Sequence, residues 1–146
     1  MKLLLDTHVL SELLRASPDA GVIAWFADQH ADALFVSAVT QAEMLFGAAL
    51  LPDGRRRTQL EQQLNAMFEE DFARRVLPFD SEAARVYASL VSGQRQARRP
   101  ISQFDAQIAA IALAHRASLV TRNVEDFEGC GLALVNPWYR PCERPG

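Results

Sequence analysis

Three carboxylic acids stand beside or inside apolar stretches of this 146-residue chain. Asp6 directly follows the run Leu3-Leu4-Leu5, while Glu43 and Asp105 fall within apolar stripes of predicted helices. An unpaired buried carboxylate costs several kcal/mol, so such acids persist when they are paired, protonated or bound to metal. Oxygen-only ligands favour Mg²⁺ or Mn²⁺, and such an ion can activate water and neutralise a phosphodiester. The pattern therefore predicts metal-dependent phosphodiester chemistry.

The helical position of Glu43 is the most informative of the three. At spacings of four, three and four residues it shares a helix face with three apolar residues, which are Val39, Phe46 and Leu50. Side chains at these spacings lie on one face of a helix, and an apolar face is expected to pack against the core. We therefore expect this stripe, Glu43 included, to be buried.

Asp105 repeats the same spacing with Ile101, Ile108 and Ala112. A second explanation stays open, because Ser102 can cap this helix with Asp105 as its third-position partner. Asp6 is likewise a reasonable N-cap for the helix that follows it.

A fourth polar group follows another predicted strand. Asn123, Glu125 and Asp126 come just after residues 119–121. A strand-to-helix cap is the alternative explanation for these side chains.

The elements that must position these groups alternate along the chain. Short apolar runs at 2–5, 34–37, 76–79, 119–121 and 133–135 predict buried strands. Helices are predicted at 9–15, from the Ser17 N-cap to about 29, at 39–51, at 57–72, at 81–92 before Gly93, and at 103–116. Alternation of this kind implies a three-layer α/β/α sandwich with a four- or five-stranded, mainly parallel sheet. Ligands of such sheets bind beyond the carboxyl ends of the strands, where Asp6 is placed.

Composition narrows the class of protein. With 49% hydrophobic and 23% charged residues, the chain is typical of one globular domain over residues 1–146, with a core at about 2–138 and a tail at 139–146. Two cysteines are too few for a disulfide framework, and Asp6 interrupts the only apolar N-terminal run, so a cytoplasmic protein without a membrane segment is expected. The single lysine, Lys2, excludes a Walker A loop, a Schiff base and a phosphoacceptor domain, the last being the alternative use of a strand-end Asp.

The arginines are the candidate contacts to a polyanion. The net charge is −3, yet 14 of the 15 basic residues are arginine, and several are clustered. Guanidinium groups suit phosphate oxygens, so we predict RNA contacts at Arg98 and Arg99 and, secondarily, at Arg55, Arg56 and Arg57. Solvated helix faces are the alternative explanation for each cluster.

Five segments resemble, in order, the motif blocks of PIN-domain proteins, and most closely VapC/FitB-type ribonuclease toxins of type II toxin–antitoxin systems. They are LLDTHVLSE at 4–12, SAVTQAEMLFG at 37–47, DAQIAA at 105–110, TRNVEDF at 121–127 and NPW at 136–138. The resemblance spans nearly the whole chain. It implies a Mg²⁺- or Mn²⁺-dependent endoribonuclease, an RNA substrate, a homodimer and a small cognate antitoxin.

Carried over position by position, Asp6, Glu43 and Asp105 match the family's three core acids and hence its metal ligands. The fourth position departs from the pattern, because Asn123 stands where relatives often carry Asp. Either Asp126 takes over that role or a second metal is weakly held. His8 also replaces the usual Asn. A rival reading is a PIN-like scaffold that binds RNA or an antitoxin but cuts poorly.

The resemblance also directs attention to how the acids would be silenced. We expect an antitoxin segment that folds on binding as an apolar helix and places an arginine among the three acids. The candidate receiving residues are Val9, Leu13, Leu45 and Leu51, with a core position as the alternative for each.

Overall fold

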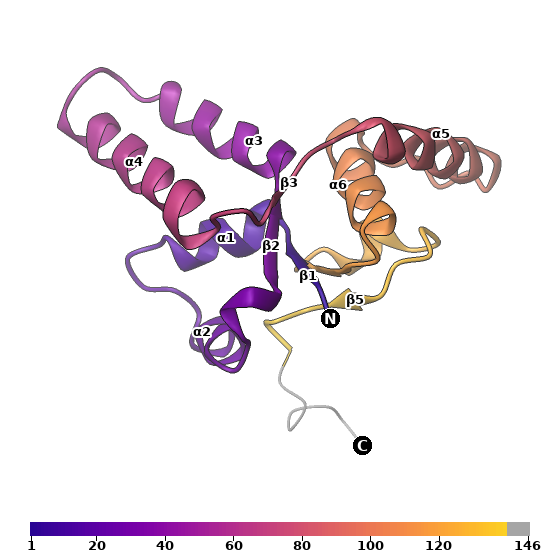
Figure 1. Cartoon of the computed structure of the whole chain (residues 1–146), viewed down its shortest axis with the longest axis horizontal. Helices are drawn as coiled ribbons and strands as arrows, with labels where there is room; N and C mark the ends of the chain where they lie inside the picture. The colour runs from indigo at the N-terminus through magenta and orange to yellow at the C-terminus, as the bar shows by residue number, and fades with distance from the viewer. Residues whose placement is uncertain (140–146) are drawn as a thin grey trace.

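A central parallel sheet carries helices on both faces (Figure 1). The computed structural model describes residues 1–139. The sheet has five strands in the order β3-β2-β1-β4-β5, and each neighbouring pair is parallel. The strands are β1 (Leu3–Leu5), β2 (Leu34–Ser37), β3 (Val76–Leu77), β4 (Ser118–Val120) and β5 (Leu134–Val135). The predicted α/β/α sandwich is confirmed, with the larger of the two expected strand numbers.

Six α-helices lie within the described residues. They are α1 (Thr7–Leu13), α2 (Ala20–Ala27), α3 (Ala38–Ala49), α4 (Arg55–Ala66), α5 (Ser81–Gln96) and α6 (Gln103–Ala114). In Figure 1, α3 and α4 form one projecting pair and α5 and α6 form another, with β1 and β2 between them. Because both pairs rise beyond the strands, the carboxyl ends of β1 and β2 lie between two helical arms.

The central strand shows how one short sequence builds two layers. Successive side chains of a strand point to opposite faces. Leu4 therefore joins the core beneath α5 and α6, while Leu3 and Leu5 join the core beneath α1, α3 and α4. All three leucines are at most 5% exposed. Strand β1 is thus buried on both faces, and the residue that follows it is held firmly.

Capping side chains set where the helices begin at this edge. The Asp6 carboxylate accepts a hydrogen bond from the Thr7 backbone N–H at 2.8 Å, and α1 starts there. The Ser37 hydroxyl accepts from the Thr40 N–H at 3.0 Å, so α3 starts directly after β2. Such caps satisfy backbone donors that the first helical turn leaves without partners.

Several predicted helix boundaries are wrong by a few residues, as in α1, which begins at Thr7 rather than at residue 9, and two of the differences have a clear cause. Helix α5 continues through Gly93 to Gln96, because Gln94 is only 5% exposed and its side chain donates to the Glu128 carbonyl at 3.1 Å. These contacts outweigh the roughly 1 kcal/mol that glycine costs inside a helix. Helix α2 begins later than expected, because Asp19 rather than Ser17 caps it through the Val22 N–H at 3.0 Å.

The predicted helix at 57–72 begins at Arg55 and changes geometry near its end. A π-helical turn at Met67–Asp71 follows α4, and the Phe72 N–H donates to the Met67 carbonyl at 2.9 Å. The wider turn lets Met67, Phe68 and Phe72 all enter the core. In the described part of the chain, no helix has both the length and the apolar character needed to cross a membrane.

Candidate active site

Asp6 is buried and held at both of its carboxylate oxygens. The residue is 4% exposed and follows the carboxyl end of β1. One carboxylate oxygen accepts from the Thr7 N–H, and the other accepts from the Thr121 hydroxyl at 2.8 Å. Thr121 follows β4, the parallel neighbour of β1, so strand pairing brings the two groups together. Both oxygens of Asp6 are therefore oriented before any ligand arrives.

Glu43 reaches the same place from α3. The Thr7 hydroxyl donates to the Glu43 carboxylate at 3.2 Å and lies 3.0 Å from the Thr40 hydroxyl. Since the Thr7 hydroxyl has one proton, which it gives to Glu43, Thr40 is the donor in the second bond. Thr7 thus links Asp6 to Glu43 through its backbone and its side chain.

Asp105 enters from the first turn of α6. The Ser102 hydroxyl accepts from the Asp105 backbone N–H at 3.2 Å, so the capping interpretation of this acid is confirmed. The Asp105 side chain also forms a hydrogen bond with Ser102, which lowers its pKa. The two explanations of Asp105 are compatible, because a carboxylate in one hydrogen bond keeps further lone pairs for the site.

The charge of Asp6 acts on both Glu43 and Asp105. Burial raises the pKa of Glu43 above its ordinary value, and the negative charges of Asp6 and Asp105 raise it further, against the lowering effects of the Thr7 hydrogen bond and His8. Burial also raises the pKa of Asp105, with the charges of Asp6 and Asp126 adding to it. His8 has the opposite, lowering effect in both cases, and its Nδ1 lies 3.9 Å from an Asp6 oxygen. Among the described residues, no lysine or arginine is among the groups that shift the pKa of Glu43 or Asp105.

The carboxylate oxygens are ligands that a hard divalent cation prefers, but they do not form a complete coordination shell. Within residues 1–139, no three Asp, Glu, His or Cys side chains lie close enough together to form a ready set of direct ligands. Mg²⁺ usually binds one or two protein carboxylates and keeps several waters, which fits acids that are near one another but not in contact. The oxygens of Asp6, Glu43 and Asp105 are the groups that could hold it.

Two residues, Asn123 and Asp126, are candidates for the fourth position of the site. Asn123 directs its side-chain amide to His8 Nδ1 at 3.4 Å, and its backbone N–H donates to the Thr121 hydroxyl at 3.1 Å. Asp126 lies in a 3₁₀ turn, Val124–Phe127, and its charge acts on Asp105. Asn123 therefore borders the site on the His8 side, and Asp126 borders it on the Asp105 side.

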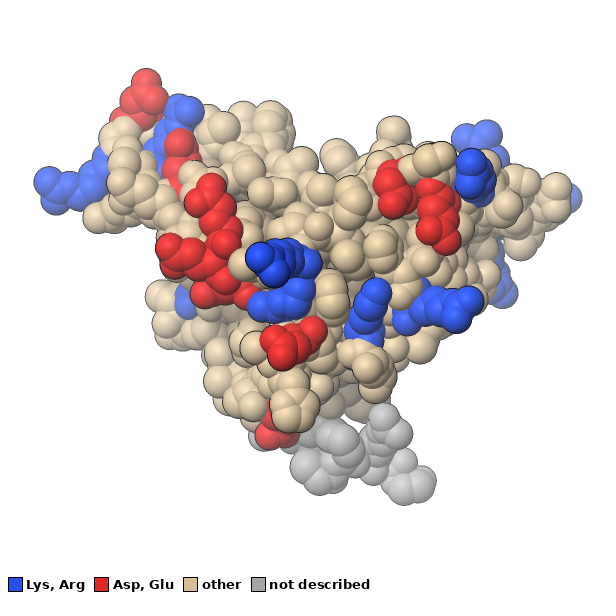
Figure 2. All heavy atoms as spheres, in the orientation of Figure 1, with Lys and Arg blue, Asp and Glu red and all other residues tan. Residues whose placement is uncertain are grey.

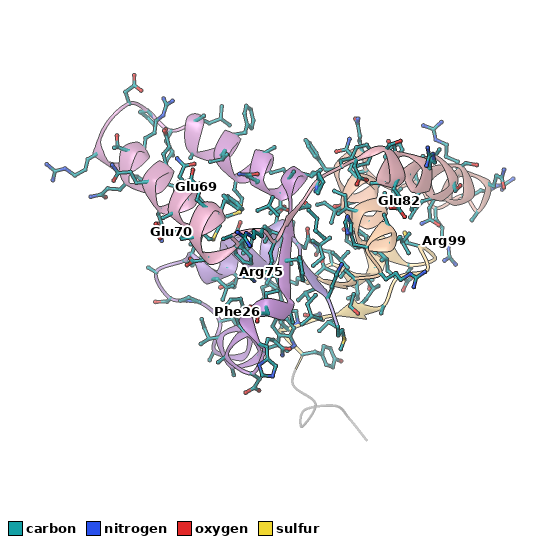
Figure 3. The ribbon with its side chains drawn as sticks, viewed as in Figure 1. Phe26, Glu69, Glu70, Arg75, Glu82 and Arg99 are labelled. Carbon is teal, nitrogen blue, oxygen red and sulfur yellow. The ribbon has the colours of Figure 1, made fainter. Side chains whose placement is uncertain are left out.

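The predicted RNA-binding arginines lie away from the acids. Arg55, Arg56 and Arg57 open α4, and Arg57 is paired with Asp53 at 2.9 Å and Glu61 at 2.6 Å. Arg98 and Arg99 follow α5, and Figure 3 shows Arg99 on the side of α5 and α6 away from α3 and α4. Figure 2 shows acidic and basic side chains interspersed over this face rather than one continuous basic surface.

Sequence reasoning missed the hydroxyl groups that orient the acids. Thr7 and Thr121 each follow a strand, as Asp6 does, and this shared placement was the available signal. It also missed a basic group around Trp138, whose ring lies 5.0 Å from the guanidinium carbon of Arg122.

One predicted stripe is only half buried. On α3, Val39 is 9% exposed, but Phe46 is 64% and Leu50 is 69% exposed. The expectation that this whole face packs into the core is therefore wrong. The helix projects beyond the sheet as part of an arm, so its outer half does not pack against the core (Figure 1).

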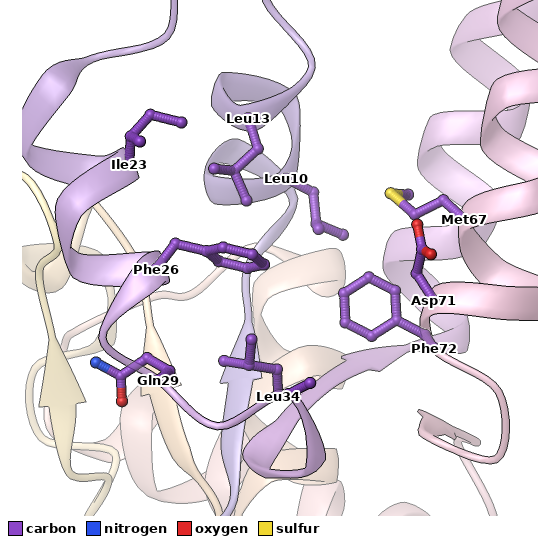
Figure 4. Close-up of a pocket in the computed structure, with 10 residues that line it drawn as sticks. Leu10, Leu13, Ile23, Phe26, Gln29, Leu34, Met67, Asp71 and Phe72 are labelled. Atoms are coloured by element: carbon purple, nitrogen blue, oxygen red, sulfur yellow. The ribbon is translucent and has the colours of Figure 1, made fainter.

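An apolar cavity of about 500 Å³ lies beside the early helices (Figure 4). Phe26 of α2 and Phe72 after the π-helical turn lie on opposite sides of it, and Leu10 and Leu13 of α1 line it from above in this view. Leu13 lines this cavity, and its role in receiving an antitoxin stays a prediction. Val9 is wrong as a receiving residue, because it is fully buried in the core.

Comparisons with known proteins agree with this geometry. The PIN domain family model matches residues 3–128. VapC ribonuclease Y4jK of Sinorhizobium fredii is 43% identical, covering 93% of this chain and 97% of its own, and toxin FitB of Neisseria gonorrhoeae is 36% identical, covering 94% and 99%. The crystal structure of FitAcB from Neisseria gonorrhoeae superposes with a TM-score of 0.90 at 36% identity, over 94% of this chain and 99% of that one. The chain therefore belongs to the PIN-domain family, within the group of VapC- and FitB-type ribonuclease toxins.

Proposed function

We propose that this chain is a Mg²⁺- or Mn²⁺-dependent endoribonuclease that acts as the toxin of a toxin–antitoxin pair. The observation that carries the proposal is that the charge of Asp6 acts on both Glu43 and Asp105, although the three acids belong to three separate segments of the chain. Within residues 1–139, no lysine or arginine is among the groups that shift the pKa of Glu43 or Asp105. A divalent cation followed by a phosphodiester is the partner that this arrangement suits. The names of the relatives as ribonucleases and toxins support the same activity.

The residues divide the work of hydrolysis between them. When bound, the divalent ion would supply activation of water and neutralisation of the scissile phosphate. Asp6, held at both oxygens by Thr7 and Thr121, keeps a fixed orientation. Asp105 or Asp6 orients the attacking water for in-line displacement. Within residues 1–139, no Cys, Ser or His is placed as an activated nucleophile, so a covalent protein intermediate is not expected there.

Arg98 and Arg99, and secondarily Arg55, Arg56 and Arg57, remain the proposed long-range contacts to the RNA backbone. They sit on the two helical arms, so an RNA strand that reached the acids between the arms could extend toward either. Their loss should weaken binding in proportion to the phosphates contacted, and more at low salt.

The antitoxin is proposed to occupy the apolar cavity of Figure 4. A helix with an apolar face would cover Leu13, Phe26 and Phe72, and a following arginine would pair with the three acids. The FitAB and VapBC names of the matched structures support a partner of this kind. A homodimer is proposed through the exposed α3 residues Phe46 and Leu50, since apolar side chains this exposed gain by mutual burial.

One observation favours a second candidate, a scaffold that binds RNA or an antitoxin but cuts weakly. At the fourth site position, Asn123 is hydrogen-bonded with His8 and brings no charge. The two candidates share every other feature of the site.

A cleavage assay separates them. The purified chain should cut a single-stranded RNA with Mg²⁺ or Mn²⁺ and should stop when a chelator is added. Asp6→Asn should abolish cleavage while the melting temperature stays near that of the wild type, because Asn fills the same volume. Asp32→Asn, at an exposed acid far from the site, is the matched control. Cleavage that resists the chelator, or an active Asp6→Asn chain, would contradict the nuclease proposal.

A further inference from the structure

A second cavity, lined mostly by polar and charged side chains, adjoins Asp6 through His8. It has a volume of about 430 Å³ and is bordered by residues that include His8, Arg15, Arg122, Asn123 and Trp138. His8 joins it to the site, because its Nδ1 lies 3.9 Å from Asp6 and 3.4 Å from the Asn123 amide. The cavity therefore borders the acidic site at His8 and Asp6.

The topology of the sheet explains why a cavity forms here. His8, Arg122 and Trp138 come shortly after β1, β4 and β5, three strands adjacent in the sheet. After β1 the chain turns toward the core that holds Val9, and after β4 it turns toward the opposite core that holds Phe127. Connections that diverge to opposite faces leave a crevice beyond the strand ends, where open α/β sheets bind their ligands.

Two guanidinium groups are held at this cavity. The Arg122 guanidinium lies over the Trp138 ring at 5.0 Å from its centroid, and stacking of this kind orients the group and leaves its N–H edge available. On the other side, Arg15 Nη1 lies 3.2 Å from a Glu12 oxygen. Glu12 is 6% exposed and also accepts from the Asp19 N–H at 3.1 Å, so it is a fixed anchor.

Arg15 itself is 67% exposed at its side chain, so the anchor leaves it facing solvent. Arg122 is exposed as well. The cavity thus presents basic N–H groups directly beside the acidic site, unlike the arginine clusters on the arms. Planar guanidinium groups match phosphate oxygens. A polyanion bound at the acids would therefore have guanidinium groups within reach of its neighbouring phosphates.

We propose that this cavity binds the phosphodiester of the nucleotide next to the scissile bond, with Arg122 and Arg15 as its contacts and Trp138 as the positioning residue for Arg122. The inference rests on the proposed nuclease function, since it places the RNA across the three acids. It adds a binding subsite that the sequence patterns did not indicate. Single-stranded RNA is the expected occupant, because its backbone can bend from the acids into the cavity.

RNA binding in a chain that cannot cut tests the subsite directly. In an Asp6→Asn background without divalent metal, a fluorescent single-stranded RNA should bind about 10-fold more weakly after Arg122→Ala. The slope of log Kd against log salt should fall by about 0.7, the value of one phosphate contact on a single strand. Arg15→Ala should weaken binding less, because the Arg15 guanidinium is already paired with Glu12. Arg85→Ala removes the same charge from an exposed position on α5 and should change neither quantity.

Trp138 needs a readout that a structural role would not move. Trp138→Phe should keep RNA affinity within about 3-fold, whereas Trp138→Leu should match the loss of Arg122→Ala and add nothing to it in the double variant. In the active chain, the same variants should raise KM more than they lower kcat. Additive losses in the double variant would overturn the positioning role.

Three outcomes separate this subsite from the nuclease proposal. If wild-type chain cuts RNA but Arg122→Ala behaves like Arg85→Ala, the subsite is wrong and the nuclease stands. If Arg122→Ala weakens RNA binding although wild-type chain does not cut, the subsite stands and the nuclease is wrong. If an acidic peptide of equal charge competes as well as the RNA, the cavity is a general anion site, and the proposal is overturned.

Discussion

Helices α3 and α6 carry the same pattern with different outcomes. Each has an acid within an apolar stripe at spacings of four, three and four residues. On α6 the stripe continues into the core, where Ile108 is 1% and Ala112 is 0% exposed. On α3 the stripe past Glu43 faces solvent at Phe46 and Leu50. The comparison teaches that an apolar stripe marks a face destined for burial, while the partner that buries it can lie outside the folded chain.

The largest effect should be common to both helices, because both acids serve one site. Glu43→Gln and Asp105→Asn should each reduce RNA cleavage by about 100-fold or more, measured as kcat/KM with Mg²⁺. Circular dichroism should show an unchanged fold. Glu70→Gln and Asp32→Asn, at exposed acids, are the controls. If one of these two variants lost cleavage and the other kept it, the acids of α3 and α6 would not be equivalent.

The next effect should distinguish the helices by stability. Ile108→Ala on α6 should lower the free energy of unfolding by about 2–4 kcal/mol, because it leaves a cavity in a closed core. Leu50→Ala on α3 should change it by about 0.5 kcal/mol or less, since this side chain is exposed in the isolated chain. Urea unfolding at low protein concentration measures both. Equal losses would show that the α3 stripe is core after all.

A smaller effect concerns what covers the α3 stripe. The wild-type chain should run as a dimer in size-exclusion chromatography with light scattering, and Phe46→Ser combined with Leu50→Ser should shift it to a monomer. The matched variant Ile23→Ser removes an apolar side chain that is 43% exposed elsewhere and should leave the dimer intact. A wild-type chain that is still monomeric at about 100 μM would have a dimer Kd weaker than roughly that concentration. That result would refute the assignment of the α3 stripe to a dimer interface.

The smallest effect is on stability as a function of pH. Glu43 and Asp105 have raised pKa values, so the folded chain binds more protons at these groups than the unfolded chain. The stability they contribute is present at pH values below their unfolded pKa, and it is lost as pH rises through the folded pKa. Without metal at pH 7, Glu43→Gln or Asp105→Asn should therefore raise the melting temperature by roughly 1–4 °C.

The control for this effect is pH itself. The gain should shrink toward zero near pH 4, where the wild-type acids regain their protons, and Glu70→Gln should show no such trend. A gain that did not depend on pH would assign it to packing rather than to charge. Saturating Mg²⁺ should also reduce the gain if the metal binds these acids.

Local patterns were enough to predict most of the elements. Leu3-Leu4-Leu5 reads as a buried strand from composition alone, and Ser102 with Asp105 reads as a helix start from the chemistry of capping. The errors arose where a distant contact outweighed a local preference. Gly93 would end a helix by its own propensity, but the buried Gln94 next to it bonds to Glu128 on another segment. The π-helical turn after α4 also depends on a core that the local sequence does not describe.

By itself, the sequence determined which groups could do chemistry, since Asp6, Glu43 and Asp105 are recognisable from residue type and helical or strand period. Only the tertiary structure decided which groups surround them. Strand pairing set Thr121 against Asp6, and the segments that follow β4 and β5 set Arg122 over Trp138 at the cavity that His8 also lines. These contacts join residues far apart in the chain, and their geometry follows from strand order and from where each connection leaves the sheet. Periodicity within one segment carries no information about either, which is why the acids could be predicted and their basic neighbours could not.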